Sequence, residues 1–131
     1  MIDVEMRVFD YVYSSVASLV PAGCFTSQFV ANPAAFPFAT LMEMDNITDT
    51  RHRGTADDEE FAIVTYEANV YAMSKSECRA IMDAIDTALG RLNFTRMSML
   101  FVPNLQDNTI FRLTGRFQAA ADANNVMYRR Q

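Results

Sequence analysis

The sequence predicts an α+β domain: a mixed, mainly antiparallel sheet of four to five strands with two helices packed on one face, in the order α-β-β-β-α-β-β. Three observations predict this class. Apolar residues recur at helical spacing near the N-terminus, residues 61–73 alternate between two faces, and a helix-capping motif follows that alternation directly. A chain of 131 residues, half of them hydrophobic, is the right size for a single domain, 1–131, with a buried core.

The first helix is expected over Val4 to Val20, where valine recurs every fourth residue and so forms one apolar helix face. Asp3 is the expected N-cap residue, because its carboxylate can accept a hydrogen bond from an unpaired N–H group of the first turn. Pro21 and Gly23 are expected to end the helix.

Two strands are expected next, Cys24 to Ala31 and Phe36 to Met44, joined by a connection short enough for a hairpin. The following segment, residues 45–60, is polar and charged. Loops of this length inside a compact domain are uncommon, and most are either functional or disordered. We therefore expect a long polar loop that acts as an arm and orders against a neighbouring molecule.

The longest expected strand runs from Phe61 to Met73. One of its faces is entirely apolar, and the other mixes polar and aromatic residues. Ser74 to Glu77 reads S-x-x-E, the capping box that begins a helix. The apolar stripe of this second helix ends at Leu89, and Gly90 is the expected left-handed residue that terminates it.

Two further strands are expected, Phe94 to Val102 and Thr109 to Ala121, followed by a flexible tail over 122–131. Arg112 and Arg116 share one face of the last strand, and Arg96 is a candidate to join them. Two interpretations stay open at this point. The arginines form cross-strand ion pairs with acids such as Glu67, or they contact another subunit.

No catalytic, metal or cofactor motif stands out in the sequence. His52 is the single histidine and lies in the polar loop, and Cys24 and Cys78 are too far apart for a usual zinc motif. The acidic run at 57–60 lacks the spacing of a calcium loop. We therefore expect a non-enzymatic protein without metal or cofactor. The formal net charge of −5 argues against general nucleic-acid binding, and no apolar run is long enough to span a membrane.

Four stretches together carry a resemblance to a known family: FPFATLMEMDN, EEFAIVTYEANVYA, SKSECRAIMDAIDTALGRLNF and VPNLQDNTIFRLTGRFQAAAD. With the opening helix, they cover Val4 to Asp122. In this order they resemble the tail-terminator, or tail-completion, proteins of long-tailed bacteriophages. The resemblance depends on element order and loose patterns, and it brings no catalytic residue with it.

The resemblance implies a virion protein that forms a hexameric ring. The ring caps the finished tail tube, stops its polymerisation and joins the tail to the connector of the head. Its implied partners are further copies of the chain, the tail tube protein and the head–tail connector proteins, with DNA passing through the channel without specific binding. Its implied location is the neck of the virion, and the host cytoplasm during assembly.

The candidate subunit interface combines the polar arm with the arginines of the last two strands. It consists of Arg51, His52, Arg53, Asp57, Asp58, Arg96, Arg112 and Arg116. Two alternatives stay open. The first is a head-closure or adaptor subunit of the head–tail connector, and the second is a small α/β ligand-binding module, which would need a concave pocket with convergent polar groups.

Overall fold

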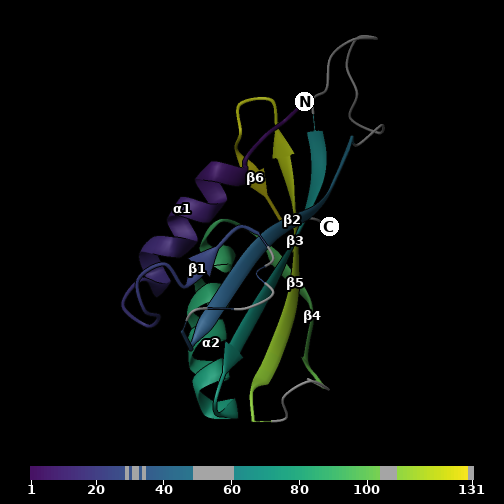
Figure 1. Ribbon diagram of the computed structural model, residues 1–131. Coiled ribbons are helices and arrows are strands. Elements are labelled where there is room, and N and C mark those ends of the chain that lie inside the picture. Colours follow the sequence, from purple (N-terminus) through teal and green to yellow (C-terminus); the bar gives the residue numbers. More distant parts are fainter. Residues whose placement is uncertain (29, 31–32, 34, 49–60, 104–108, 130–131) are drawn as a thin grey trace.

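The computed structural model describes all residues except 29, 31–32, 34, 49–60, 104–108 and 130–131. Two helices lie side by side on one face of a six-stranded sheet, and no described helix covers the other face (Figure 1). The strand order is β1-β2-β3-β5-β4, with β6 paired to β5. All strand pairs are antiparallel except β1 with β2. The α+β class and the mainly antiparallel sheet predicted from the sequence are confirmed.

Helix α1 spans Glu5–Val16 and is shorter than predicted. Val8, Val12 and Val16 are fully buried in the core, but the chain at 17–19 is exposed. A helix of this size is stabilised mainly by packing, so it ends where its buried face ends, before Pro21 is reached. The N-cap position is Val4, and Asp3 instead accepts a hydrogen bond from the Glu5 N–H at 3.1 Å.

The first two strands differ from the expected hairpin. β1 contains only Phe25–Thr26 and runs parallel to β2, which spans Phe38–Thr48. β2 therefore continues through the first four residues of the predicted loop, and the rest of that loop lies outside the described residues. The extension has a partner available, because Ile47 and Thr48 pair with Ile63 and Ala62 of β3.

Strand β3, Phe61–Ala72, and helix α2, Lys75–Arg91, agree with the sequence prediction except at the helix end. The Ser74 hydroxyl accepts a hydrogen bond from the Glu77 N–H at 3.2 Å, as a capping box requires. Gly90 is helical, and the left-handed residue is Asn93, with φ of 69°. Asparagine tolerates this conformation, so the helix gains a further turn before the chain reverses.

Strands β4, Thr95–Val102, and β5, Phe111–Asp122, form an antiparallel pair. β5 lies between β3 and β4, so the helical crossover from β3 returns one strand further along the sheet. The structure places a turn and the short strand β6, Met127–Tyr128, where the sequence predicted a flexible tail. The Asp122 carboxylate holds this turn by accepting hydrogen bonds from the N–H groups of Asn124 and Val126.

The core lies between the helices and the sheet. β3 contributes one complete apolar face to it, and α2 contributes the predicted stripe, which includes Ile85 and Leu89. Both cysteines are buried and free. Burial raises the pKa of the Cys78 thiol, so the unreactive thiol form is favoured.

Candidate assembly surface

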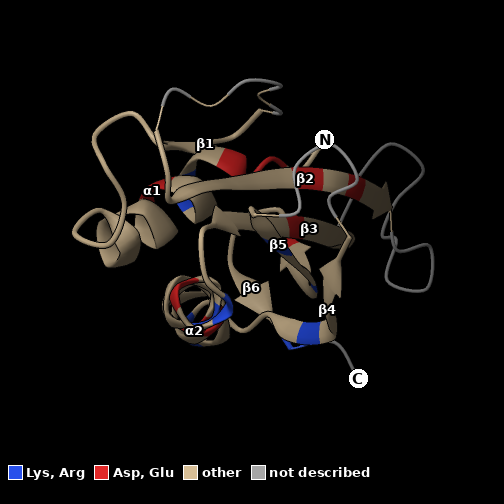
Figure 2. Ribbon diagram, turned by 60° about the horizontal axis from the view of Figure 1, so that its bottom comes forward, with Lys and Arg blue, Asp and Glu red and all other residues tan. Residues whose placement is uncertain are grey.

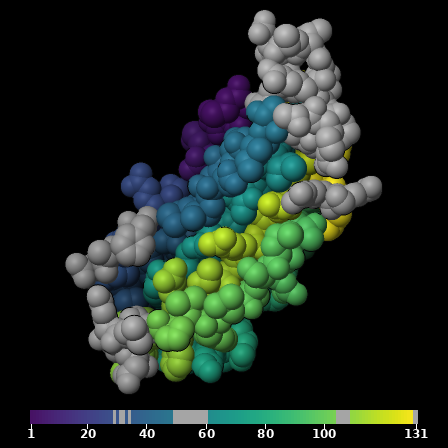
Figure 3. Space-filling view, turned by 90° about the vertical axis from the view of Figure 1, so that its right-hand side faces the viewer, coloured from purple at the N-terminus to yellow at the C-terminus, as the bar shows by residue number. Residues whose placement is uncertain are grey.

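The helix-free face of the sheet is built from alternate residues of the four long strands. The registers place side chains of β2, β3, β5 and β4 in rows that cross the sheet. One row contains Met42, Glu67, Arg116 and Ser98, and the next contains Thr40, Asn69, Thr114 and Leu100. Figure 3 shows these strands as neighbouring bands of colour on this face.

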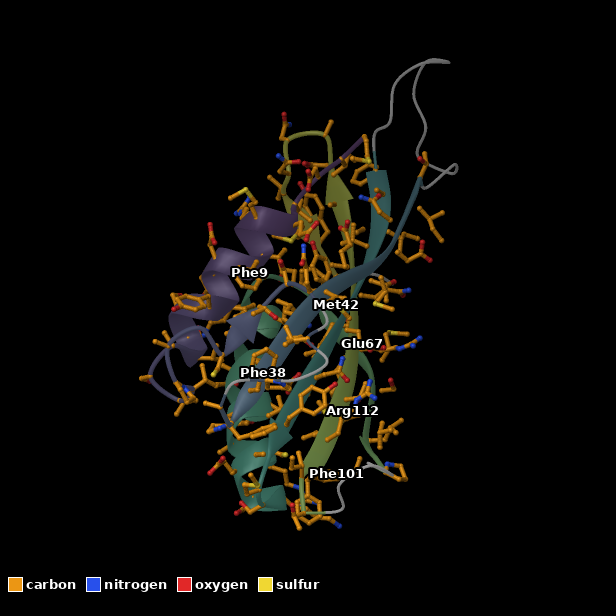
Figure 4. The ribbon with its side chains drawn as sticks, in the orientation of Figure 1. Phe9, Phe38, Met42, Glu67, Phe101 and Arg112 are labelled. Carbon is orange, nitrogen blue, oxygen red and sulfur yellow. The ribbon has the colours of Figure 1, made fainter. Side chains whose placement is uncertain are left out.

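A hydrogen-bonded polar network occupies the centre of this face. The Arg116 Nε donates to Glu67 Oε2 at 3.0 Å, and the Asn69 Nδ2 donates to the other Glu67 oxygen, Oε1, at 3.0 Å. Asn69 Oδ1 in turn accepts from Arg112 Nε at 3.0 Å and from the Thr114 hydroxyl at 2.7 Å. Figure 4 shows Glu67 and Arg112 on the same helix-free side of the sheet, with Met42 nearby.

This network is buried at its centre and exposed at its margin. Glu67 and Asn69 are among the few buried polar residues, whereas the Arg116 side chain keeps 55% of its surface exposed. In the part of the chain that the structure describes, every buried side-chain nitrogen and oxygen has a hydrogen-bond partner. Such a network rigidifies the sheet and holds the arginine side chains in position.

Exposed apolar side chains flank the network on both outer strands. Met44 and Ile47 lie on β2, and Met97 and Leu100 lie on β4. Met44 and Met97 each sit at a β-bulge, where the register shifts between Glu43 and Asp45 and between Arg96 and Ser98. Large exposed apolar groups around a satisfied polar centre are typical of a contact surface more than of a catalytic cleft.

The structure separates the predicted interface residues. Arg112 and Arg116 share the helix-free face as expected, and the Glu67 ion pair that was the simpler alternative is present. Arg96 does not join them. Its register partner is Phe117 of the core, so it lies on the helix side and pairs with Asp86 of α2 at 3.4 Å. Arg51, His52, Arg53, Asp57 and Asp58 lie outside the described residues.

Sequence reasoning missed the contribution of β2 and of Asn69 to this surface. The alternation of β3 had placed Asn69 on the polar face. Its partners Arg112 and Thr114 could be identified only once β5 was known to lie next to β3. Glu43 was expected in the second strand, but Asp45 was expected in a loop, and the strand extension places Asp45 at a sheet edge.

Glu43 and Tyr66 form a second polar pair, on the helix side of β2 and β3. The Tyr66 hydroxyl donates to Glu43 Oε1 at 3.2 Å. Burial raises the pKa of Glu43 above its ordinary value of 4.5, and the nearby carboxylates of Glu5 and Asp3 raise it further, against the effect of the Tyr66 hydrogen bond. Burial also raises the pKa of the Tyr66 hydroxyl, so this group remains a donor.

An open groove of about 370 Å³ lies between α2 and β4. Its apolar lining includes Met82 and Leu113, and both positive and negative side chains line it as well: Arg79, Arg96, Asp83 and Asp86. Among the described residues, no three histidine, cysteine or acidic side chains gather where they could hold a metal ion. Neither described helix is long and apolar enough to cross a membrane.

Comparison with known proteins finds the same fold in a particle-forming chain. No protein-family model and no curated protein matches this sequence. Among solved structures, a chain of the virion of a native gene transfer agent (GTA) particle is similar, with a TM-score of 0.56 and 16% sequence identity. The similarity covers 87% of this chain and 93% of that one, so the fold is shared over nearly the whole of both.

Proposed function

We propose that this chain is a structural virion protein whose copies form a closed ring that caps a tail tube, ends its polymerisation and joins the tail to the head connector. The observation that carries the proposal is the fold shared with a chain of the GTA virion over nearly the full length of both chains. The order of helices and strands is the second support, since it is the order by which the sequence resembles tail-terminator proteins.

The surface chemistry supports an assembly role. The helix-free face presents a rigid hydrogen-bonded centre with exposed methionine, leucine and isoleucine side chains beside it. A closed ring requires one patch of a subunit to fit a different patch on the next copy. The two outer strands provide two such patches on opposite edges of one sheet. In this proposal the protein acts through its shape and its contacts, without catalysis.

The charge of the chain suits the passage of DNA. The formal net charge is −5, which disfavours tight binding to a polyanion. A channel lined by such subunits lets DNA slide through without being held. The proposed partners are therefore other copies of the chain, the tail tube and the connector, with no specific DNA contact.

Two experiments test the proposal. Mass photometry of the purified protein, alone and with tail tubes, should show a ring of defined mass, which we expect to be a hexamer. Electron microscopy after deletion of the gene in the producing strain should show overlong tails or tails without heads. Heads that leak DNA and carry no tails would instead assign the chain to head closure, and a permanently monomeric protein that never binds tubes would contradict a ring.

A further inference from the structure

The sheet has two outer edges that differ in character. At one edge lies β4, for which β5 is the only pairing strand among the described residues. At the other edge lies β2, of which β1 covers only the positions of Ala39 and Thr40. Unpaired strand edges are templates for pairing with another chain, and natural proteins rarely leave them unprotected without a use.

The strand directions determine how a second copy would meet these edges. β2, β3, β5 and β4 alternate in direction across the sheet, so β2 and β4 are antiparallel to one another. A rotation about an axis along the strands keeps every direction unchanged. In a ring of that kind, β2 of one copy comes beside β4 of the next in the antiparallel arrangement, which is the more stable ladder.

The same rows predict which residues would meet. The row of Glu43 passes through Tyr66 and Phe117 and reaches Arg96 at the other edge. A ring whose copies are not staggered continues each row into the next subunit, and so places Glu43 of one copy beside Arg96 of its neighbour. The rows of Leu41, Met42 and Asp45 lead likewise to Met99, Ser98 and Thr95.

The charges of the two edges are complementary. Glu43 and Asp45 lie on β2, with Glu5 and Asp3 close enough to Glu43 to affect its ionisation. Arg96 lies on β4, and Arg116 and Arg112 occupy the neighbouring positions of β5, although Asp86 and Glu67 each pair with one of these arginines. Figure 2 shows the acidic segments of β2 and the basic segment of β4 at opposite edges of the sheet.

We infer that β2 of one copy adds antiparallel to β4 of the next, so that the sheet continues around the proposed ring with Glu43 facing Arg96. The inference rests on the proposed ring and names its contact. Pairing of like edges is disfavoured, because β2 against β2 brings four glutamate and aspartate side chains together and β4 against β4 brings two Arg96 side chains together. The exposed methionines at the two bulges, Met44 and Met97, then become buried between copies.

Cross-linking of two proteins that each carry one introduced cysteine tests the contact. Chains carrying Met44→Cys and chains carrying Met97→Cys are mixed, assembled alone or on tail tubes, and treated with a short bis-maleimide. The expected product is a mixed pair with one chain of each kind, and the buried Cys24 and Cys78 should stay unlabelled. Met73→Cys is the matched control for Met97→Cys, since both methionines are 56% exposed but Met73 lies off the edge.

The outcomes separate this inference from the proposed function. Pairs of like chains, or rings that assemble without any cross-link, overturn the edge pairing and leave the ring intact. A protein that neither forms rings nor binds tubes removes the ring and the edge pairing together.

A second pair of variants measures the same contact without cross-linking. Met97→Lys places a charge at the centre of the proposed interface and should raise the dissociation constant of the ring about tenfold or more. Met73→Lys should leave it unchanged. Both substitutions replace exposed side chains, so circular dichroism should show folded proteins. Equal effects of the two variants overturn the inference.

A charge exchange tests the predicted register. Arg96→Glu should weaken assembly, and adding Glu43→Lys should restore it, because opposite charges face each other again. The melting temperatures of both proteins show whether a loss of assembly comes from misfolding. A double variant that keeps its melting temperature but does not recover assembly overturns the Glu43–Arg96 pairing, and the cross-linking result still decides the edge contact.

Discussion

The two faces of β3 belong to one strand but differ in their chemistry. On the helix side, Val64, Tyr66 and Val70 are almost completely buried in an apolar core. On the other side, Glu67 and Asn69 are also buried, but beneath the side chains of a polar network and not beneath a helix. One face is closed within the monomer, and no described helix covers the other.

The two faces therefore differ in how much each contributes to the stability of the fold. Apolar burial on the helix side supplies the main driving force for folding. The polar side contributes less to stability, since each hydrogen bond adds only about 1 kcal/mol net, but it holds side chains in defined positions. Substitutions of buried apolar residues on the helix side should therefore cause the largest losses of stability, and substitutions on the open side should alter its surface while the fold persists.

Leu89→Ala should produce the largest loss of stability. Leu89 is fully buried in the stripe of α2, and its truncation leaves a cavity that costs about 2–5 kcal/mol. Chemical denaturation followed by circular dichroism measures the change in the free energy of unfolding. A negligible loss would show that α2 does not form the core with the sheet.

Asn69→Ala should have a smaller effect, on the open face. It removes the acceptor of Arg112 and Thr114 and the donor to Glu67, at a cost of about 1–3 kcal/mol for buried polar groups left unpaired. Thr114→Val keeps the shape but removes a single donor, so it should cost about 1 kcal/mol. If Asn69→Ala were as damaging as Leu89→Ala in the same denaturation experiment, the distinction between the two faces would fail.

Glu43→Gln should stabilise the protein at neutral pH by less than Asn69→Ala destabilises it. Because the folded-state pKa of Glu43 is raised, the folded state holds this proton more tightly than the unfolded state does. The wild-type protein therefore loses stability as the pH rises from about 4.5 through the raised pKa, and the glutamine variant lacks this loss. Denaturation across pH 3–8 measures the difference, and the two proteins should converge below the ordinary carboxyl pKa. A difference in the free energy of unfolding that persists at pH 3 would show that titration of Glu43 is not its cause.

Arg96→Ala should have the smallest effect on the monomer. Its ion pair with Asp86 is exposed, and such pairs contribute less than about 1 kcal/mol. Arg116→Ala is the matched comparison. Its partner Glu67 is buried in the network, so this substitution should lower the free energy of unfolding by more than Arg96→Ala does. Denaturation at two salt concentrations separates the two pairs, since salt screens the exposed one more strongly. Equal costs would show that burial of Glu67 does not strengthen its pair.

Much of the fold was predictable from local pattern. The valine spacing indicated α1, the alternation of β3 identified its buried face, and the S-x-x-E motif marked the start of α2. Prediction failed at element ends and in strand pairing. α1 ends at Val16, the last buried residue of its apolar face, and residue pattern alone did not reveal that β1 runs parallel to β2.

The candidate surface was only partly predictable. Arg112 and Arg116 were placed on one face correctly, because side chains two or four positions apart in a strand point the same way. Arg96 was a candidate to join them and lies on the other face, because the bulge between Arg96 and Ser98 breaks the alternation of β4. A bulge depends on how one strand meets its neighbour, so the alternation of one strand does not reveal it.

By itself, the sequence determined the secondary structure class, the apolar faces and the absence of a recognisable catalytic motif, because these follow from residue chemistry and spacing along one chain. Only the tertiary structure decided which strands are neighbours, where the edges lie and which charges occupy them. The reason is that pairing between distant segments is set by the collective packing of the core, and residues 43 and 96 share a row only once β3 and β5 lie between them.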